Sequence, residues 1–227
     1  MLTFRGDSAS PDKVDTPPGV IFTAIAAGPY HNCAIDTRGD IWCWGYNPDG
    51  RLGVGTDGDE RDTPTLVNAP GVTFTHVSLG WSHTCALDTT DRTWCWGSAS
   101  RGRLGNGANA GTSLSPANVE LPDGVTFVAL GLGHDHSCAI DTEGLPWCWG
   151  SNDRAALGNG TNDDGLEPVK VDAPSDTTFD SIIGGAGHTC AVSTADTVWC
   201  WGANDFGQLG DGTTDDHIEP APVVGFP

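Results

Sequence analysis

Residues 31–45 read HNCAIDTRGDIWCWG, and this stretch of sequence recurs three more times in the chain. The other copies are HTCALDTTDRTWCWG at 83–97, HSCAIDTEGLPWCWG at 136–150 and HTCAVSTADTVWCWG at 188–202. Each copy has two short apolar-rich segments around a turn, which predicts a β-hairpin. The first cysteines of successive copies lie 52, 53 and 52 residues apart, so the chain is built on an internal repeat.

The cysteine spacing within each copy predicts a disulfide across the hairpin. A three-residue hairpin loop favours a left-handed residue at its third position, and the copies carry Gly39, Asp91, Gly144 and Asp196 there. In that register the two cysteines of a copy face each other, close enough for a disulfide after a modest adjustment. The expected pairs are Cys33–Cys43, Cys85–Cys95, Cys138–Cys148 and Cys190–Cys200. Free buried thiols and zinc stay open as alternatives, although zinc sites use tighter spacings and need further ligands.

Persistent disulfides are typical of an oxidising compartment, so we expect an extracellular, cell-surface or periplasmic protein. The first ten residues, MLTFRGDSAS, have no apolar core of the signal-peptide kind; we expect that a signal was removed or was never present. No apolar run approaches the ~20 residues of a membrane helix, so we expect no membrane insertion.

The same register gives each hairpin two apolar faces. Trp42 lies opposite Ala34, with Trp44 on the same face, and the cysteines lie on the other face with Ile35 and Ile41. Large tryptophans against small alanines suit sheets that pack closely face to face. These tryptophans are therefore predicted to be core residues and not a ligand cage.

Two further elements recur around each hairpin. Apolar segments that begin with phenylalanine precede it and are predicted as strands: FTAIAAG, FTHVSLG, FVALGLG and FDSIIGG. Extended segments with a proline, which a sheet edge tolerates, occur five times: at Pro11, Pro64, Pro116, Pro168 and Pro220. Since the hairpin occurs four times, the segment from Ile218 to Pro227 is predicted to be a surplus strand that could pair with another copy.

This count gives the expected domain organisation. Residues 1–10 form an N-terminal extension, and residues 11–227 form a single repeat domain. Its repeats span about 11–63, 64–115, 116–167 and 168–219, with the start of a fifth at 220–227.

The repeat resembles that of the regulator of chromosome condensation 1 (RCC1) family. The resemblance rests on Gly-x-x-His-[NTS]-Cys-Ala-[ILV], then Trp-Cys-Trp-Gly, then Asn-x-x-Gly-Gln-Leu-Gly-x-Gly-Thr, over essentially residues 11–227. Copy two departs from it at Ala99 and copy three at Ala155. The resemblance implies an all-β fold, an RCC1-like β-propeller or an open propeller arc, because family members are propellers, normally with seven blades. It implies no single activity, since the family includes nuclear exchange factors, light sensors, ubiquitin-ligase modules and secreted inhibitors.

The charge of the chain argues against one class of partner. Ten lysines and arginines stand against thirty aspartates and glutamates, a formal net charge of −20. Nucleic-acid binding depends on neutralising phosphates with basic side chains, so we expect no nucleic-acid partner.

Candidate binding residues should break the repeat, since four equivalent sites are not expected. The turn before each hairpin varies and holds Tyr30, Trp81, His134 and Asp135, which we predict to contact a protein partner. Acidic loops near the end of the repeats offer weak calcium candidates, Asp211, Asp215 and Asp216, although none matches a known calcium loop. The recurrent histidines could ring a metal ion, but the resemblance implies that each bonds neighbouring backbone or Trp-Gly groups: His31, His83, His136 and His188.

No catalytic constellation emerges, so we expect a protein that is not an enzyme and needs no cofactor, calcium aside. The predicted function is an extracellular recognition or assembly module, which could associate head-to-tail through its terminal strands. A structural subunit of a surface filament and a guanine-nucleotide exchange regulator of a small GTPase are the alternatives.

Overall fold

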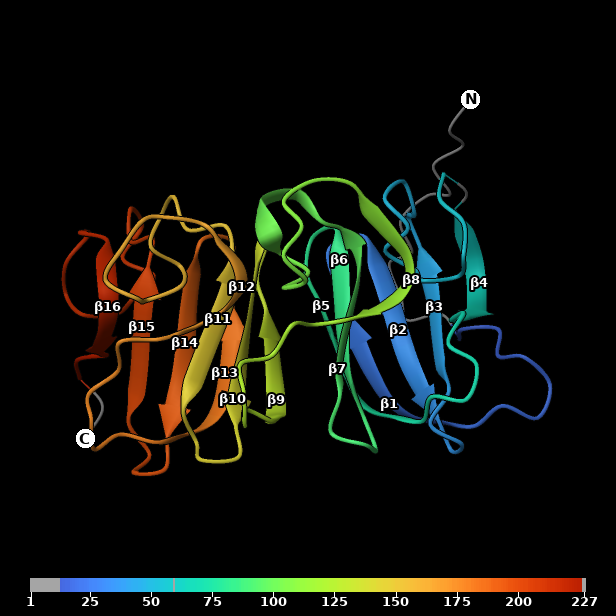
Figure 1. Ribbon diagram of the computed structural model, residues 1–227, viewed down its shortest axis with the longest axis horizontal. Helices are drawn as coiled ribbons and strands as arrows, with labels where there is room; N and C mark the ends of the chain where they lie inside the picture. Colours follow the sequence, from blue (N-terminus) through green and yellow to red (C-terminus); the bar gives the residue numbers. More distant parts are fainter. Residues whose placement is uncertain (1–12, 59, 226–227) are drawn as a thin grey trace.

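The computed structural model describes residues 13–58 and 60–225, which form four antiparallel sheets of four strands each (Figure 1). Each sheet is one blade, and its strands are neighbours in chain order. Blade 1 contains β1 (Phe22–Ala27), β2 (His31–Asp36), β3 (Ile41–Gly45) and β4 (Arg61–Leu66). Blade 2 contains β5 (Phe74–Leu79), β6 (His83–Asp88), β7 (Thr93–Ser98) and β8 (Thr112–Asn118). Blade 3 contains β9 (Phe127–Leu132), β10 (His136–Asp141), β11 (Pro146–Gly150) and β12 (Gly165–Lys170), and blade 4 contains β13 (Phe179–Gly184), β14 (His188–Ser193), β15 (Val198–Gly202) and β16 (His217–Pro222).

The all-β prediction is confirmed. The helical structure of the described segments is one short 3-10 turn, Ser100–Gly102. Among these same residues, no helix has the length and apolar character needed to cross a membrane.

The predicted hairpins and their disulfides are present in all four blades. The register sets Cys33 opposite Cys43 and Ala34 opposite Trp42, with equivalent pairs in the other blades. All four expected disulfides are formed, and each joins the two central strands of one blade. The third loop residue has the expected left-handed backbone, even where it is Asp91 or Asp196.

A buried aspartate closes the hairpin turn in blades 1 to 3. In blade 2, Asp88 Oδ1 accepts hydrogen bonds from the backbone amides of Thr90 (2.7 Å) and Arg92 (3.1 Å), and its Oδ2 accepts one from Trp94 Nε1 (2.8 Å). Burial raises the pKa of Asp88, but hydrogen bonds from Trp94 and the turn outweigh it and lower the pKa overall. Blade 4 has Ser193 at this place, and Trp199 Nε1 is buried without a partner among the described residues.

We expect exchange of these two residues to move stability in opposite directions. Asp88→Ser strands the Trp94 indole N–H and should lower the free energy of unfolding by roughly 1–3 kcal/mol. Ser193→Asp supplies the missing acceptor for Trp199 and should raise it by about 1 kcal/mol. Urea unfolding at pH 7 measures both changes. Equal destabilisation by the two variants would contradict the role of the aspartate.

The proline-containing segments are the outer strands of the blades, and this corrects the predicted surplus strand. Strand β16, which contains Pro220, pairs with β15 and completes blade 4. The segment Ile218–Pro227 is therefore not a spare strand, insofar as it is described. The copy without a blade of its own is the N-terminal one, of which residues 13–21 contain no strand, while Pro11 lies outside the described residues. Each expected repeat limit also falls inside an outer strand: 63/64 in β4, 115/116 in β8, 167/168 in β12 and 219/220 in β16.

Three apolar clusters hold the blades together, one at each junction between neighbours. At the first junction, the disulfide face of blade 1, with Ile35 and Leu52, packs against Phe74, Val77 and Trp96 of blade 2. The same pattern recurs at the second and third junctions. Within the described ranges no cluster joins blade 4 to blade 1, so the fold is an open propeller arc, with blade 1 and blade 4 at its ends (Figure 1).

Candidate functional site

The predicted binding residues come together in one aromatic row that crosses three blades. Tyr30 lies in the turn between β1 and β2, Trp81 between β5 and β6, and His134 between β9 and β10. Their rings are in contact: the centroids of Tyr30 and Trp81 are 4.9 Å apart, and those of Trp81 and His134 are 3.8 Å apart. Tyr46, which follows β3, extends the row at 6.1 Å from Tyr30. We call Tyr46, Tyr30, Trp81 and His134 the aromatic row.

The turns that carry the row are fixed to one another by backbone hydrogen bonds. Trp81 N donates to the carbonyl of His134 (3.3 Å), and His134 N donates to the carbonyl of Gly185 in blade 4 (3.0 Å). The row itself ends at blade 3, because blade 4 has Ala186 and Gly187 in the equivalent turn.

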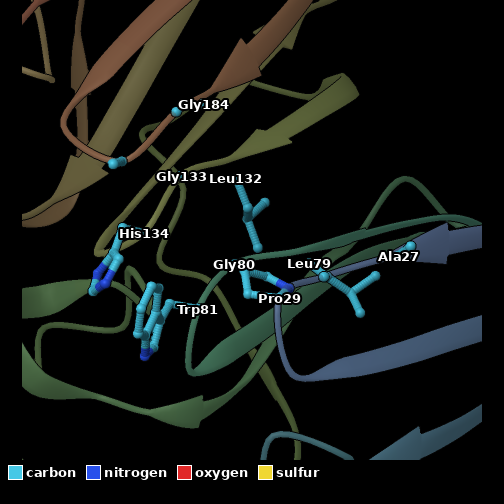
Figure 2. A pocket seen from close by; sticks show the side chains of 12 residues that line it. Ala27, Pro29, Leu79, Gly80, Trp81, Leu132, Gly133, His134 and Gly184 are labelled. Carbon is cyan, nitrogen blue, oxygen red and sulfur yellow. The ribbon is translucent and has the colours of Figure 1, made fainter. Parts of the chain in front are cut away.

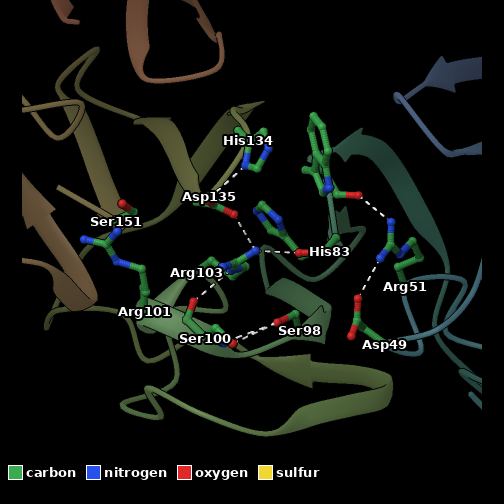
Figure 3. A network of polar contacts seen from close by, with 12 residues as sticks. Asp49, Arg51, His83, Ser98, Ser100, Arg101, Arg103, His134, Asp135 and Ser151 are labelled. Carbon is green, nitrogen blue, oxygen red and sulfur yellow. Dashed lines mark hydrogen bonds and ion pairs between the residues drawn. The ribbon is translucent and has the colours of Figure 1, made fainter. Parts of the chain in front are cut away.

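Two buried arginines support the row from beneath, and each spans a blade junction (Figure 3). Arg51 of blade 1 donates to the carbonyl of Trp81 (2.7 Å), and its guanidinium lies 6.0 Å from the Tyr30 ring centroid and 5.4 Å from that of Tyr46. Arg103 of blade 2 pairs with Asp135 of blade 3 at 2.6 Å. These arginines hold the turns of the aromatic row in place across the two junctions.

Carboxylates flank the aromatic row at the surface. Asp49 pairs with Arg51 (2.6 Å), and Asp135 pairs with both Arg103 and His134 Nδ1 (2.9 Å). Both carboxylates stay about one-third exposed, whereas the arginine side chains are buried. The accessible groups are therefore aromatic rings and acidic oxygens, a combination that suits basic side chains through cation–π and ionic contacts.

A hollow of about 390 Å³ opens beside the row (Figure 2). The four equivalent turns line it with five glycines, and its larger side chains are Leu79, Trp81, Leu132 and His134. It is an open depression and offers few side-chain functional groups, so it adds room next to the row but no chemistry of its own.

Three of the four recurrent histidines lie within hydrogen-bond distance of a hydroxyl group on the next blade. His31 Nε2 lies 2.7 Å from Thr84 Oγ1, His83 Nε2 lies 2.8 Å from Ser137 Oγ, and His136 Nε2 lies 2.9 Å from Thr189 Oγ1. Burial, reinforced by the positive charge of Arg51, lowers the pKa of His31 to about 3. Burial likewise lowers the pKa of His136 to about 4 and that of His83 well below its usual value, so these rings are neutral at pH 7.

The acidic calcium candidates have other partners. Asp211 accepts hydrogen bonds from Thr213 and pairs with His217 (2.7 Å), and Thr213 lowers the pKa of Asp211 to about 2. Asp216 pairs with Arg154 (2.8 Å) and accepts from the backbone of Asn204, while the backbone amide of Asp215 donates to Thr213. In the described part of the chain, no three histidine, cysteine or acidic residues are grouped as they would be to hold a metal ion.

Sequence reasoning found three of the four rings but missed Tyr46 and the arginines. Tyr46 stands where the other repeats have Ser98, Ser151 and Ala203, so the rule that a site breaks the repeat would have found it. Arg51 and Arg103 lie in a loop that looked purely structural, and their roles depend on how neighbouring blades meet.

The comparisons with known proteins agree with this fold. The family model described as the RCC1-like domain matches residues 5–226. The chain is 30% identical over 214 residues to the ultraviolet-B receptor UVR8 of Arabidopsis thaliana, covering 94% of this chain and 48% of that protein. It is 31% identical over 223 residues to the human E3 ubiquitin-protein ligase HERC2, covering 97% of this chain but 5% of the ligase.

A solved structure shows the same architecture. Prp20p from Saccharomyces cerevisiae, described with its binding to Gsp1p and histones, superposes with a TM-score of 0.84 at 22% identity. The match covers 95% of this chain and 53% of Prp20p, so this chain spans about half the length of UVR8 and of Prp20p. With four copies of the repeat and a family model that matches nearly every residue, the chain belongs to the RCC1-like domain family.

Proposed function

We propose that this chain is a non-enzymatic protein-recognition module that works outside the reducing cytoplasm. The aromatic row is the observation that carries the proposal. Tyr30 and Tyr46 are each 45% exposed and Trp81 is 38% exposed, although their rings contact one another and are held by a rigid scaffold. Exposed aromatic clusters on loops of such scaffolds are typical anchors of protein interfaces.

The charges around the row favour a basic partner. Asp49 and Asp135 present carboxylate oxygens beside the rings, and the whole chain carries a formal charge of −20. A lysine or arginine of a partner could lie over Tyr30 or Trp81 and pair with one of these carboxylates. Four disulfides in the described residues support an oxidising location, extracellular, cell-surface or periplasmic.

The alternatives have narrower support. Exchange activity on a small GTPase rests on the family resemblance, and family membership defines a scaffold and not an activity. A role as the subunit of a larger assembly is favoured by a separate observation, namely the two open ends of the arc.

Selection from a random peptide display library tests the recognition proposal. We expect the native, disulfide-bonded chain to enrich peptides with lysine or arginine next to aromatic residues, and we expect Trp81→Ala and Tyr30→Ala to lower their affinity at least roughly tenfold. Val128→Ser is the control, because it removes an exposed apolar side chain that lies outside the row. Enrichment of acidic peptides, or binding that survives both row variants, would overturn the proposal.

A further inference from the structure

The two ends of the arc present faces that every internal blade buries. Ile25 of blade 1 is 68% exposed. The residues at its place in blades 2 to 4 pack on the preceding blade and are at most 8% exposed: Val77, Leu130 and Ile182. At the other end, Ile183 of blade 4 is 66% exposed, and its counterpart Gly131 lies against the strand of the next blade.

Each internal junction has the same chain of hydrogen bonds, from a histidine to a hydroxyl group and from that hydroxyl to a backbone carbonyl; we call it the relay. The hydroxyl of Thr84, on blade 2, donates to the carbonyl of Arg51 on blade 1 (2.9 Å). Its oxygen is then free to accept from His31 Nε2, at 2.7 Å. The second and third junctions repeat the relay, with Ser137 bonded to the carbonyl of Arg103 and Thr189 bonded to that of Ala156. The carbonyls of Arg103 and Ala156 also accept from the indoles of Trp149 (3.0 Å) and Trp201 (2.9 Å).

Each end of the arc has the groups of only one side of such a junction, and within the residues that the structure describes these groups have no neighbouring blade to bond to. On blade 4, His188 occupies the histidine position and Gln208 the carbonyl position, and neither His188 Nε2 nor the Gln208 carbonyl has a hydrogen bond from the described residues. On blade 1, Asn32 occupies the hydroxyl position and Trp44 the indole position. Asparagine can fill both roles of the hydroxyl, because its amide group donates while its oxygen accepts. The amide of Asn32 on blade 1 could therefore donate to the Gln208 carbonyl and accept from His188 Nε2 on blade 4 of a second copy.

The loops above the relay are matched in the same way. Arg101 of blade 2 reaches Asp153 of blade 3, and Arg154 of blade 3 reaches Asp205 of blade 4, both within 2.8 Å. Blade 4 has Phe206 at the position of these arginines, and it is 92% exposed. Blade 1 has Pro48 at the position of these aspartates. At the second and third junctions this pair is charged on both sides, and at the first junction the same positions hold Asp49 and Ser100. The pair formed by the two ends is apolar on both sides.

We propose that blade 4 of one chain packs on blade 1 of a second chain, and that two such junctions close a ring of two copies. The internal junctions give the geometry of the contact, with His188 facing Asn32 and Phe206 facing Pro48 of the neighbour. The chain has four blades and its match covers 53% of Prp20p, so two arcs supply eight blades, one more than the seven usual in the family. The junction is heterologous, so a ring of two forms only where each copy accounts for half a turn, and any other rotation gives an open polymer. Its existence does not depend on the aromatic row or its partner.

The molar mass of the folded, disulfide-bonded 227 residues tests this directly, by sedimentation equilibrium from 1 to 100 µM. We expect twice 23.6 kDa, the mass of two copies. Ile25→Asp and Ile183→Asp each place a charge in the junction and should leave a folded monomer, because both residues are exposed in one copy. Val128→Asp is the matched control, since Val128 is 56% exposed on an internal blade and its variant should stay dimeric.

Mixing the two monomeric variants distinguishes this junction from a symmetric one. In a one-to-one mixture, one junction joins the two unaltered faces, so dimers should reappear. Within the relay, Asn32→Thr restores the internal pattern and should keep the dimer, while Asn32→Val should weaken it roughly tenfold. A monomeric wild type, an open-ended polymer, or a dimer that survives both Ile25→Asp and Ile183→Asp would overturn the proposal.

Discussion

Reduction of the four disulfides should unfold this chain at neutral pH and 25 °C. Each disulfide closes a ten-residue separation within one hairpin, which on the chain-entropy model stabilises the fold by roughly 2–3 kcal/mol. The four together contribute roughly 8–12 kcal/mol, comparable with the ~5–15 kcal/mol stability of a typical domain. Circular dichroism, recorded before and after complete reduction with thiol alkylation, measures the loss of the β signal.

Removal of a single disulfide gives the matched control. The double variant Cys85→Ala with Cys95→Ala should stay folded and lose roughly 2–3 kcal/mol, plus a small packing term, since both sulfurs are fully buried. If the fully reduced and alkylated chain kept its β signal and its urea midpoint, the disulfides would not be what stabilises the blades.

A fall in pH from 7 to 5 should destabilise the protein by roughly 6 kcal/mol. His31, His83 and His136 are buried and neutral, with folded pKa values far below the usual 6.5 because burial disfavours the charged ring. Below pH 6.5 these rings bind protons in the unfolded chain but not in the folded one. Stability is therefore complete above pH 6.5 and is lost as the pH falls toward 4, at ~2 kcal/mol for each histidine between pH 7 and 5. Urea midpoints measured at half-unit steps follow the loss.

One substitution isolates the contribution of the histidines. His83→Gln keeps a side-chain N–H but does not titrate, so it should remove at most one third of the pH dependence, because burial also lowers the pKa values of His76 and His188. A urea midpoint that is constant from pH 7 to 5, or a His83→Gln variant with the full dependence, would show that these rings accept protons in the folded protein. The turn aspartates act in a separate and lower range, because the pKa values of Asp36 and Asp88 are lowered and their protonation weakens the fold below about pH 4.

The hairpins were predictable from sequence because the features shared by the four copies fix the register of strand pairing. Four copies with the same loop length and a glycine or aspartate at the third loop position admit one antiparallel pairing, and that pairing sets cysteine opposite cysteine. The limits of the blades were not predictable in this way. The period of the repeat does not show where a repeat begins, so the segment around Pro64 could be the first strand of one blade or the last strand of the blade before it. Pairing between β3 and β4 decides the matter, and that contact is invisible in a list of spacings.

The candidate site was predictable only as far as it breaks the repeat. Tyr30, Trp81 and His134 stood out because this turn differs in every copy, and the fourth copy has Ala186 and Gly187 there. That these rings touch depends on the close approach of neighbouring turns, which the glycines Gly80 and Gly133 permit: a Cβ at either one would lie within 2.7 Å of another blade's backbone. The arginines beneath the row bond to residues of the next blade. The sequence of one repeat does not show which residues of the next blade will lie beside it.

Disulfide mapping of the protein from its natural source tests the central claim most directly, that each blade is a hairpin joined by its own disulfide in an oxidising compartment. The protein would be trapped with a thiol-blocking reagent as the cells are opened, digested without reduction and sequenced by mass spectrometry. We predict four linked peptides, Cys33–Cys43, Cys85–Cys95, Cys138–Cys148 and Cys190–Cys200, and no blocked cysteine. Eight blocked thiols, or any link between different blades, would contradict both the stabilisation of the fold and the location proposed for it.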